Sequence, residues 1–304
     1  MQTTRGAATG ASAGIEARAE LARRLRAREF TSVPGVFELI SARIADGYGF
    51  PALYMTGYGA VASHLGLPDA GLATYTEMVD RVARICSVTR TPLIADGDTG
   101  YGGLLNVQHT VRGYEQAGAA GIQLEDQQFP KKCGHTDGLR PVISIDEAAA
   151  KIRVAVESRE SPDFLVVART DARSDHGLDE ALRRGEAFAK AGADVLFIEG
   201  PQSIEEMQAI GRAFDQPLMA NMVDGGRTPV LPAEELREVG YTIAIFPATG
   251  FLAMGAALRS VYDHIAEHGS SAGLDQPLHD FAAFSDLMGF PEVLEFEERW
   301  AGQG

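Results

Sequence analysis

Eight short apolar segments recur along the chain at fairly regular intervals, and amphipathic stretches separate them. Each segment is β-branched or aliphatic and lacks the polar–apolar alternation of a half-exposed strand, which is typical of parallel strands buried on both faces. Eight such strands alternating with helices predict an α/β fold, a (β/α)8 barrel of the TIM type. The segments are FTSVPGV (30–36), PALYMTG (51–57), TPLIADGD (91–98), GIQLED (121–126), FLVVARTD (164–171), VLFIEG (195–200), PLMANM (217–222) and TIAIFP (242–247).

The stretches between the predicted strands have the pattern of amphipathic helices. Two of them, 106–119 and 178–193, contain Ala-Gly near their ends, which is a plausible helix stop. An open doubly wound sheet is the alternative arrangement. The GxGxxG fingerprint of dinucleotide-binding sheets does not follow the first strand, however, and its absence favours the barrel.

Two regions lie outside the predicted alternation of strands and helices. Residues 1–14 have no apolar signal core and are expected to form a flexible tail. Residues 15–304 are expected to form a single barrel domain with a C-terminal helical extension. The helices expected outside the alternation are 15–29, 250–268, 280–290 and 291–300.

The charge and composition of the chain exclude several classes of partner. The formal net charge is −15 over 304 residues, so a surface that neutralises the phosphates of nucleic acid or of an anionic membrane is not expected. No apolar run approaches the roughly 20 residues that cross a bilayer. Two cysteines and no secretion signal favour the reducing cytoplasm. We therefore expect a soluble cytoplasmic protein without a nucleic-acid or membrane partner.

Polar residues or glycines follow almost every predicted strand. In a barrel of this type, chemistry takes place at the carboxyl ends of the strands. We therefore expect these residues to converge on one pocket. They are Tyr54, Thr56 and Gly57 after the second strand, Asp96 and Asp98 after the third, Glu125 after the fourth, Arg169 after the fifth, Glu199 after the sixth, Asn221 after the seventh and Pro247 after the eighth.

The acidic residues of the third and fourth strands indicate a metal ion. Asp96 and Asp98 point the same way because side chains alternate with period two, and Glu125 ends the neighbouring strand. Clustered carboxylates repel one another unless a cation balances them, and oxygen-only ligands suit Mg²⁺. Helix caps and salt bridges are the alternative use of such carboxylates, and we expect that use for Asp126. No Cys/His spacing typical of zinc accompanies them.

The stretch EDQQFPKKCGH (125–135) places a cysteine among two lysines, a glycine and a histidine. Nearby positive charge favours the thiolate form, and an exposed thiol without a function invites oxidation. A structural cysteine in a surface turn is the alternative, but we interpret Cys133 as functional. Cys86, in an apolar helical pattern, is interpreted as inert and buried.

Arg169 ends a buried apolar strand, so its guanidinium needs an anionic partner. That partner is either Asp171 or the carboxylate of a substrate, for which the guanidinium fork is well suited. The residues alone leave both roles open. Glu199 and Asn221 carry the same ambiguity between a structural and a ligand-binding role.

The motifs ADGDTGYG, LEDQQFPKKCGH, VARTDA, FIEG and ANMVDGGRTP follow one another between residues 30 and 290. With these motifs the sequence resembles the isocitrate lyase and phosphoenolpyruvate mutase superfamily, and KKCGH after the fourth strand is the most specific of them. The motifs FPKKCGH and NMVDGGRTP look closest to the group of 2,3-dimethylmalate lyase and the petal death protein. The resemblance implies an α/β barrel with Mg²⁺, or alternatively Mn²⁺, at the strand ends. It also implies a homotetramer in which the eighth helix is exchanged between subunits.

The resemblance assigns roles to individual residues. Asp98 would be the nearest Mg²⁺ ligand, with Asp96 and Glu125 acting directly or through water. Residues 131–135 would form a mobile loop that closes over the substrate. The catalytic residues would be Tyr54, Lys131, Lys132, Cys133, His135 and Glu199, and the substrate-binding residues would be Thr56, Gly57, Tyr58, Asp69, Gly134, Arg169, Asn221 and Pro247.

The expected reaction is the cleavage of a 2-hydroxy dicarboxylate, a 2-alkylmalate such as 2,3-dimethylmalate, to pyruvate and a short carboxylate. A base, Tyr54 or Glu199, takes the hydroxyl proton, and Cys133 protonates the other fragment at carbon.

Relatives that cleave 2-methylisocitrate have an arginine where this chain has Leu252, and oxaloacetate hydrolases typically have a serine in place of Pro247. Both activities remain alternatives, and a catalytically silent metal-binding scaffold is the non-enzyme alternative.

Overall fold

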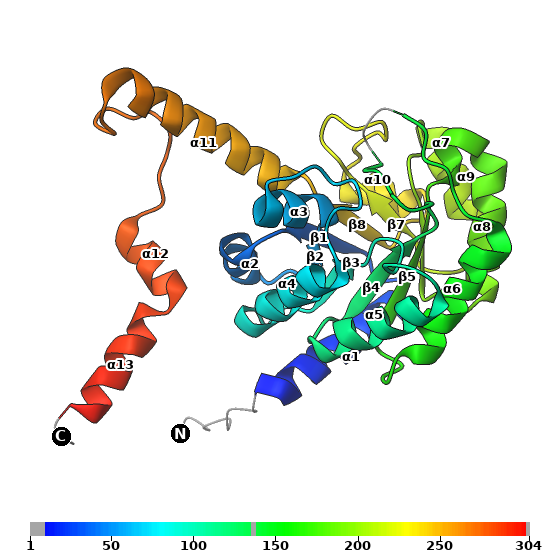
Figure 1. The fold of residues 1–304 in the computed structure, drawn as a ribbon, viewed down its shortest axis with the longest axis horizontal. Coiled ribbons are helices and arrows are strands. Elements are labelled where there is room, and N and C mark those ends of the chain that lie inside the picture. Colours follow the sequence, from blue (N-terminus) through cyan, green and yellow to red (C-terminus); the bar gives the residue numbers. More distant parts are fainter. Residues whose placement is uncertain (1–9, 135–137, 302–304) are drawn as a thin grey trace. The chain divides into compact units, whose positions relative to one another are not determined.

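The structure is a computed structural model that describes residues 10–134 and 138–301, and it contains the eight predicted strands (Figure 1). The strands are β1 (Thr31–Val36), β2 (Leu53–Met55), β3 (Leu93–Asp96), β4 (Gly121–Glu125), β5 (Leu165–Thr170), β6 (Val195–Ile198), β7 (Met219–Asn221) and β8 (Ile243–Phe246). The helices that alternate with them or precede them are α1 (Gly10–Arg26), α2 (Leu39–Asp46), α3 (Gly57–Leu65), α4 (Tyr75–Val88), α5 (Leu104–Gln116), α6 (Ile145–Ser158), α7 (Ala172–His176), α8 (Leu178–Lys190), α9 (Ile204–Ala213) and α10 (Ala233–Glu238).

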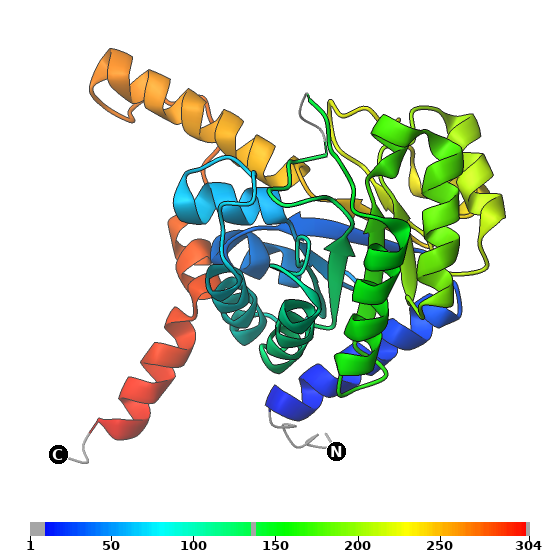
Figure 2. The same cartoon turned by 45° about the vertical axis from the view of Figure 1, so that its right-hand side comes forward.

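The strands form a parallel barrel, as the sequence predicts. They are hydrogen-bonded in the order β6-β5-β4-β3-β2-β1-β8-β7, so the first and last strands of the chain are neighbours. A parallel bridge between Leu196 and Leu218 brings β6 beside β7 and nearly closes the ring. Figure 2 shows the helices outside this ring. The alternative of an open sheet is therefore wrong.

The residues that fill the barrel interior also set the direction of the polar residues at its end. One buried cluster combines alternate strand residues with three residues of α1, which closes the end at which the strands begin (Figures 1 and 2). Because side chains alternate with period two, the next inward residues along these strands project at the opposite end. The interior cluster contains Leu21, Ala22, Leu25, Val33, Ala52, Tyr54, Ile94, Ala120, Leu165, Val167, Val195, Phe197, Met219, Ile243 and Ile245.

Local sequence signals start and stop the helices around the barrel. Thr74 and Glu77 cap each other's backbone at the start of α4, as a Thr-x-x-Glu box does. Gly118 and Gly192 follow α5 and α8 with φ angles of 98° and 97°, so the predicted Ala-Gly stops are confirmed. Helix α1 begins at Gly10, within the segment predicted as a tail, and residues 1–9 lie outside the described part of the chain.

The chain divides into two compact units, Met1–Gly250 and Phe251–Gly304. The second unit contains most of α11 (Thr249–His268), together with α12 (Phe281–Met288) and α13 (Phe290–Trp300). Among its described residues, 251–301, none is buried. No helix in the described ranges is long and apolar enough to span a membrane.

Candidate active site

Four buried carboxylates lie where β3 and β4 end. Asp96 ends β3, Asp98 follows two residues later, Glu125 ends β4, and Asp69 lies between α3 and α4. The backbone N–H of Glu125 donates to the carbonyl of Asp98 at 2.9 Å, which joins the two strand ends. The ammonium of Lys131 contacts both Asp69 and Asp98. The predicted convergence of acidic residues at this end of the barrel is thus present.

Contacts on both carboxylate oxygens hold Asp96 in place. Its Oδ1 accepts hydrogen bonds from the backbone N–H of Asp98 at 3.0 Å and from Gln123 Nε2 at 3.3 Å. Its Oδ2 lies against Gly57, where a Cβ atom would collide with it. Burial, followed by the charge of Asp98, raises the pKa of Asp96 to about 6. The absence of a side chain at Gly57 therefore lets the start of α3 approach a buried carboxylate.

The turn DTGYGG holds Asp98 in a left-handed backbone conformation, with a φ of 48°. Aspartate adopts this region more readily than most residues other than glycine. The turn is anchored by two buried side chains. Tyr114 Oη donates to the carbonyl of Asp96 at 3.1 Å, and Lys151 Nζ donates to the carbonyl of Thr99 at 3.0 Å. These bonds fix the backbone from which the Asp98 carboxylate projects.

The ammonium group of Lys131 lies between Asp69 and Asp98. Its Nζ is 2.6 Å from Asp69 Oδ1 and 2.7 Å from Asp98 Oδ1, and the residue is only 3% exposed. Neither oxygen has a further hydrogen-bond partner in the described part of the chain. Burial alone would lower the pKa of Lys131, but the surrounding carboxylates, Asp98 first and then Glu125, raise it well above its usual value. At neutral pH Lys131 is therefore a fixed positive charge in the pocket.

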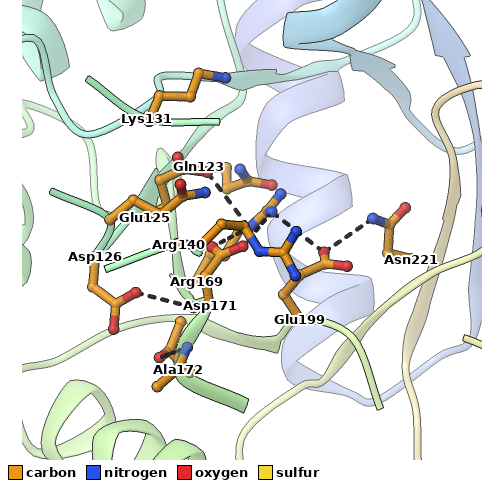
Figure 3. A network of polar contacts seen from close by, with 12 residues as sticks. Gln123, Glu125, Asp126, Lys131, Arg140, Arg169, Asp171, Ala172, Glu199 and Asn221 are labelled. Carbon is orange, nitrogen blue, oxygen red and sulfur yellow. Dashed lines mark hydrogen bonds and ion pairs between the residues drawn. The ribbon is translucent and has the colours of Figure 1, made fainter. Parts of the chain in front are cut away.

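Arg169 joins the ends of β4, β5 and β6, and its guanidinium is paired within the protein. Its Nε and Nη2 donate to the two carboxylate oxygens of Asp171, each at 2.8 Å. The same two atoms approach Glu125 Oε2 at 3.5 Å and Glu199 Oε2 at 3.6 Å (Figure 3). Asn221 Nδ2 donates to Glu199 Oε2 at 3.0 Å. The structural role of Arg169 is thus present, and its binding of a substrate carboxylate stays a prediction.

The segment from Lys131 to Gly134 runs along the pocket. At Gly134, a Cβ atom would come within 2.8 Å of Arg169 Nη2, so glycine lets the backbone reach the guanidinium. Cys133 lies between Gly134 and Lys131, whose ammonium pairs with Asp69 and Asp98. It is half-buried, and its backbone N–H donates to the carbonyl of Asp69 at 3.2 Å. The backbone of Cys133 is therefore held beside Asp69, and the catalytic role of its thiol stays a prediction.

The rest of the predicted loop is only partly covered by the described residues. Lys132 is exposed, and its backbone is held by the side chain of Gln127, which donates to its carbonyl at 2.9 Å and accepts from its N–H at 3.0 Å. The catalytic role predicted for Lys132 stays a prediction. His135 lies outside the described residues.

Tyr54 lies inside the barrel, beneath the carboxylates. Its hydroxyl donates to Gln123 Oε1 at 2.6 Å, and Gln123 in turn contacts Asp96. Burial, followed by the charge of Asp96, raises the pKa of Tyr54 well above its usual value. As a neutral phenol, Tyr54 therefore needs a change in its surroundings before it can accept a proton from a substrate.

The remaining predicted substrate residues lie at the same end of the barrel but vary in exposure. Thr56 is buried before the start of α3, whereas Tyr58 is 39% exposed on that helix. Pro247, after β8, lies close to Gly35 of β1, where a Cβ atom would collide with its backbone. The substrate contacts of these residues stay predictions.

The donor atoms of the pocket suit a hard divalent cation such as Mg²⁺. Glu125 Oε1 is buried and has no hydrogen-bond partner within the described residues. No three His, Cys, Asp or Glu side chains in those ranges are placed as a ready-made metal cage. Mg²⁺ does not need one, because it usually takes one or two carboxylates and keeps several water ligands. Asp98, with Asp96 and Glu125 beside it, would hold such an ion, and this site stays a prediction.

Three polar residues that sequence reasoning did not single out support the site. Gln123 precedes Glu125 by two residues on the same strand face, a spacing from which its inward direction follows. Arg184 of α8 pairs with Asp126 at 2.9 Å, which confirms the structural role expected for Asp126. Arg140 donates to Ser174 Oγ of α7 at 2.7 Å. The two arginines carry no comparable signal in the sequence.

Comparison with known sequences shows similarity along most of the chain. The family model of phosphoenolpyruvate phosphomutase matches residues 21–266. The 2,3-dimethylmalate lyase of Eubacterium barkeri is 46% identical over 277 residues, which cover 91% of this chain and 96% of that protein. The 2-methylisocitrate lyase of Aeropyrum pernix is 42% identical over 263 residues, which cover 86% of this chain and 84% of that protein.

Comparison with solved structures confirms the predicted fold. Oxaloacetate acetylhydrolase in complex with 3,3-difluorooxalacetate superposes with a TM-score of 0.88 at 35% identity, covering 95% of this chain and 98% of that chain. A 2,3-dimethylmalate lyase gives 0.86 at 36% identity, with coverage of 95% and 96%. Phosphonopyruvate hydrolase in complex with oxalate and Mg²⁺ gives 0.83 at 27% identity, with coverage of 93% and 99%.

Proposed function

The chain belongs to the phosphoenolpyruvate mutase/isocitrate lyase superfamily, and on this premise we propose that it is a Mg²⁺-dependent carbon–carbon lyase that cleaves a 2-alkylmalate. The first candidate substrate is 2,3-dimethylmalate, which would give pyruvate and propionate. The observation that carries the proposal is the segment 131–134. In it, Cys133 lies between Lys131, whose ammonium pairs with Asp98, and Gly134, where a side chain would collide with Arg169.

The residues of the site divide into those that would bind the part of the substrate that becomes the keto acid and those that would transfer protons. Asp98 would hold Mg²⁺, with Asp96 and Glu125 acting directly or through water. When bound, Mg²⁺ supplies a Lewis acid for the oxygens of the forming keto acid. Arg169, oriented by its two bonds to Asp171, would stabilise the keto-acid carboxylate.

Cleavage requires one proton to leave an oxygen and another to arrive at a carbon. A base removes the proton of the 2-hydroxyl, the oxygen forms the keto group, and the bond between carbons 2 and 3 breaks. The electron pair of that bond passes to carbon 3 and its carboxylate as an enediolate, and the Cys133 thiol protonates carbon 3. A free thiol has a pKa of about 8.5, which suits a general acid at neutral pH. Transfer of the first proton from the base to the thiolate would restore the site.

Two residues stay candidates for the base. The hydroxyl of Tyr54 donates to Gln123, and its pKa is raised by burial, so it starts as a poor base. The buried carboxylate of Glu199 lies near Arg169 and Gly134. The variants Tyr54→Phe and Glu199→Gln distinguish the two candidates. The variant that lacks the base should no longer cleave the substrate but should still bind pyruvate.

Two other activities have a specific observation in their favour. The 2-methylisocitrate lyase of Aeropyrum pernix is 42% identical, and oxaloacetate acetylhydrolase superposes with a TM-score of 0.88. Against the first, enzymes that cleave 2-methylisocitrate have an arginine where this chain has the uncharged Leu252. Against the second, Pro247 stands where those hydrolases typically carry serine. Cleavage of a 2-alkylmalate remains the proposal.

The experiment is a comparison of kcat/KM for 2,3-dimethylmalate, 2-methylisocitrate and oxaloacetate with Mg²⁺, with products identified by NMR. We expect 2,3-dimethylmalate to be preferred and to give pyruvate and propionate. Discrimination among alkyl malates should be only several-fold, since one buried methyl group contributes about 1 kcal/mol. Preference for 2-methylisocitrate, or conversion of oxaloacetate to oxalate and acetate, would overturn the assignment. If none of these diacids is turned over, the result would favour the alternative of a catalytically silent metal-binding scaffold.

A further inference from the structure

Lys131 differs from the lysine beside it in every contact. Its ammonium is buried and bridges two carboxylates from separate parts of the chain, at 2.6 Å from Asp69 and 2.7 Å from Asp98. Lys132 is exposed, and its described contacts are made by its backbone. Two adjacent lysines thus offer the same charge in opposite environments.

The charge balance of the pocket depends on Lys131. Asp69, Asp96, Asp98 and Glu125 are all buried there. The second buried cation, Arg169, gives its closest contacts, both at 2.8 Å, to Asp171. Lys131 is therefore the cation that lies directly against Asp69 and Asp98, whereas Arg169 approaches Glu125 at 3.5 Å.

The position of the ammonium matters for metal binding. Asp98 is the residue proposed to hold Mg²⁺, and its Oδ1 is the atom that Lys131 contacts. A Mg²⁺ ion lies about 2.0–2.1 Å from its ligand oxygens, so an ion bound to the same oxygen would stand within a few ångströms of the ammonium. A dication and an ammonium at that separation in a poorly solvated pocket repel each other strongly.

We propose that Lys131 is an internal counter-ion that competes with Mg²⁺ for Asp98, so that metal binding displaces its ammonium from the carboxylates. The inference rests on the Mg²⁺ site of the proposed function and adds a regulatory link to it. Lys131 lies two residues before Cys133, whose backbone is bonded to Asp69. Displacement of Lys131 therefore loosens the segment that carries the general acid. A bound dicarboxylate restores negative charge to the pocket and draws Lys131 back.

The first test measures metal affinity without substrate, by calorimetric titration of Mg²⁺ into the full-length protein. Lys131→Met removes the competing charge and should tighten Mg²⁺ binding by at least about tenfold. Lys132→Met removes an equal charge one residue away, from a solvated position, and should change the affinity by no more than about twofold. Unchanged or weaker binding by Lys131→Met, or equal tightening by both variants, overturns the competition.

The second test uses the unmutated protein, because Lys131→Met leaves Asp69 and Asp98 unpaired and can fail to fold. Lysine side chains are acetylated with and without Mg²⁺, and modification of Lys131 and Lys132 is quantified by mass spectrometry. We expect Mg²⁺ to raise the labelling rate of Lys131 several-fold and to leave Lys132, the internal control, unchanged. A Lys131 rate that does not respond to Mg²⁺ overturns the proposal.

The two tests separate this inference from the function on which it rests. If the wild-type protein binds Mg²⁺ and cleaves its substrate but Lys131 does not respond, the displacement alone is wrong. If the wild-type protein binds no Mg²⁺ in the titration, the metal assignment of the proposed function is wrong. The proposed competition between Lys131 and Mg²⁺ is then wrong as well.

Discussion

At the scale of single residues, Cys133 is the side chain on which the proposed chemistry most directly depends. Replacement by serine keeps the size of the side chain but removes the acid, so we expect Cys133→Ser to lower kcat by about 10²–10⁴-fold. The inhibition constant of pyruvate should stay nearly constant, because Arg169 and the metal carboxylates are untouched. Steady-state kinetics checks both values, with Cys86→Ala as the matched loss of the other thiol. Near-wild-type turnover by Cys133→Ser would show that the thiol is not the acid.

Two buried acidic residues, Asp98 and Asp126, should respond differently to mutation. Asp98→Asn removes one charge from a crowded carboxylate pocket, so we expect Mg²⁺-dependent turnover to be abolished while thermal stability is kept. Asp126→Asn instead weakens a buried pair with Arg184, and we expect a loss of about 1–3 kcal/mol of stability. Calorimetry of unfolding and a Mg²⁺ titration measure the two effects. Full activity of Asp98→Asn, or activity of the wild type in excess chelator, would contradict the metal assignment.

The sequence predicted which residues converge but not how they pair. Period two along the strands placed Asp96 and Glu125 at one end of the barrel, because each strand repeats the same geometry. The ion pair of Lys131 with Asp69 has no such local signal. It depends on the path of two irregular loops, which periodicity does not determine. For the same reason, the sequence could not decide whether Arg169 pairs with Asp171 or with the carboxylate of a ligand.

At the scale of helices and strands, the apolar segments predicted all eight strands, since a strand buried on both faces needs an uninterrupted apolar run. Short helices were less predictable. Helix α7, Ala172–His176, follows β5 without an apolar repeat long enough to recognise. The start of α1 at Gly10 was missed as well, because glycines and small residues give a weak helical pattern. Capped helices such as α4 carry their own boundary signals.

Helix α4 carries a prediction about alkaline pH. Burial raises the pKa of the Cys86 thiol on this helix to about 12, against about 8.5 in an unfolded chain. Below pH 8.5 both states keep the proton and stability does not change. Above it, only the unfolded state ionises, so the free energy of unfolding should fall by about 1.4 kcal/mol per pH unit. Urea unfolding of the wild type and Cys86→Ala between pH 8 and 10 isolates this contribution. Cys86 is half-buried rather than fully buried as predicted, and parallel curves for the two proteins would show that the folded state does not raise the pKa of its thiol.

At the scale of the whole molecule, the sequence predicted a barrel followed by a helical extension, and the structure contains both. It separates the extension, Phe251–Gly304, as a unit of its own. A barrel can be read from its repeat because each strand and helix pair buries its own faces. The extension has no such repeat, and its described residues, 251–301, bury no side chain.

The exposed face of α11 leads to the last prediction, which is the assembly of the chain. Met254, Leu258, Tyr262 and Ile265 recur at helical spacing and are between 40% and 61% exposed, a larger apolar stripe than an isolated helix tolerates in water. We expect these residues to be covered by other copies of the chain in a homotetramer, so that light scattering gives four times the chain mass of 32.4 kDa. Leu258→Glu places a charge in this stripe and should dissociate the assembly. Ser260→Glu adds the same charge at an exposed polar position of the same helix and should leave it intact. A monomeric wild type at micromolar concentration would mean that α11 is not covered by another subunit, and equal effects of the two variants would mean that the stripe is not the contact.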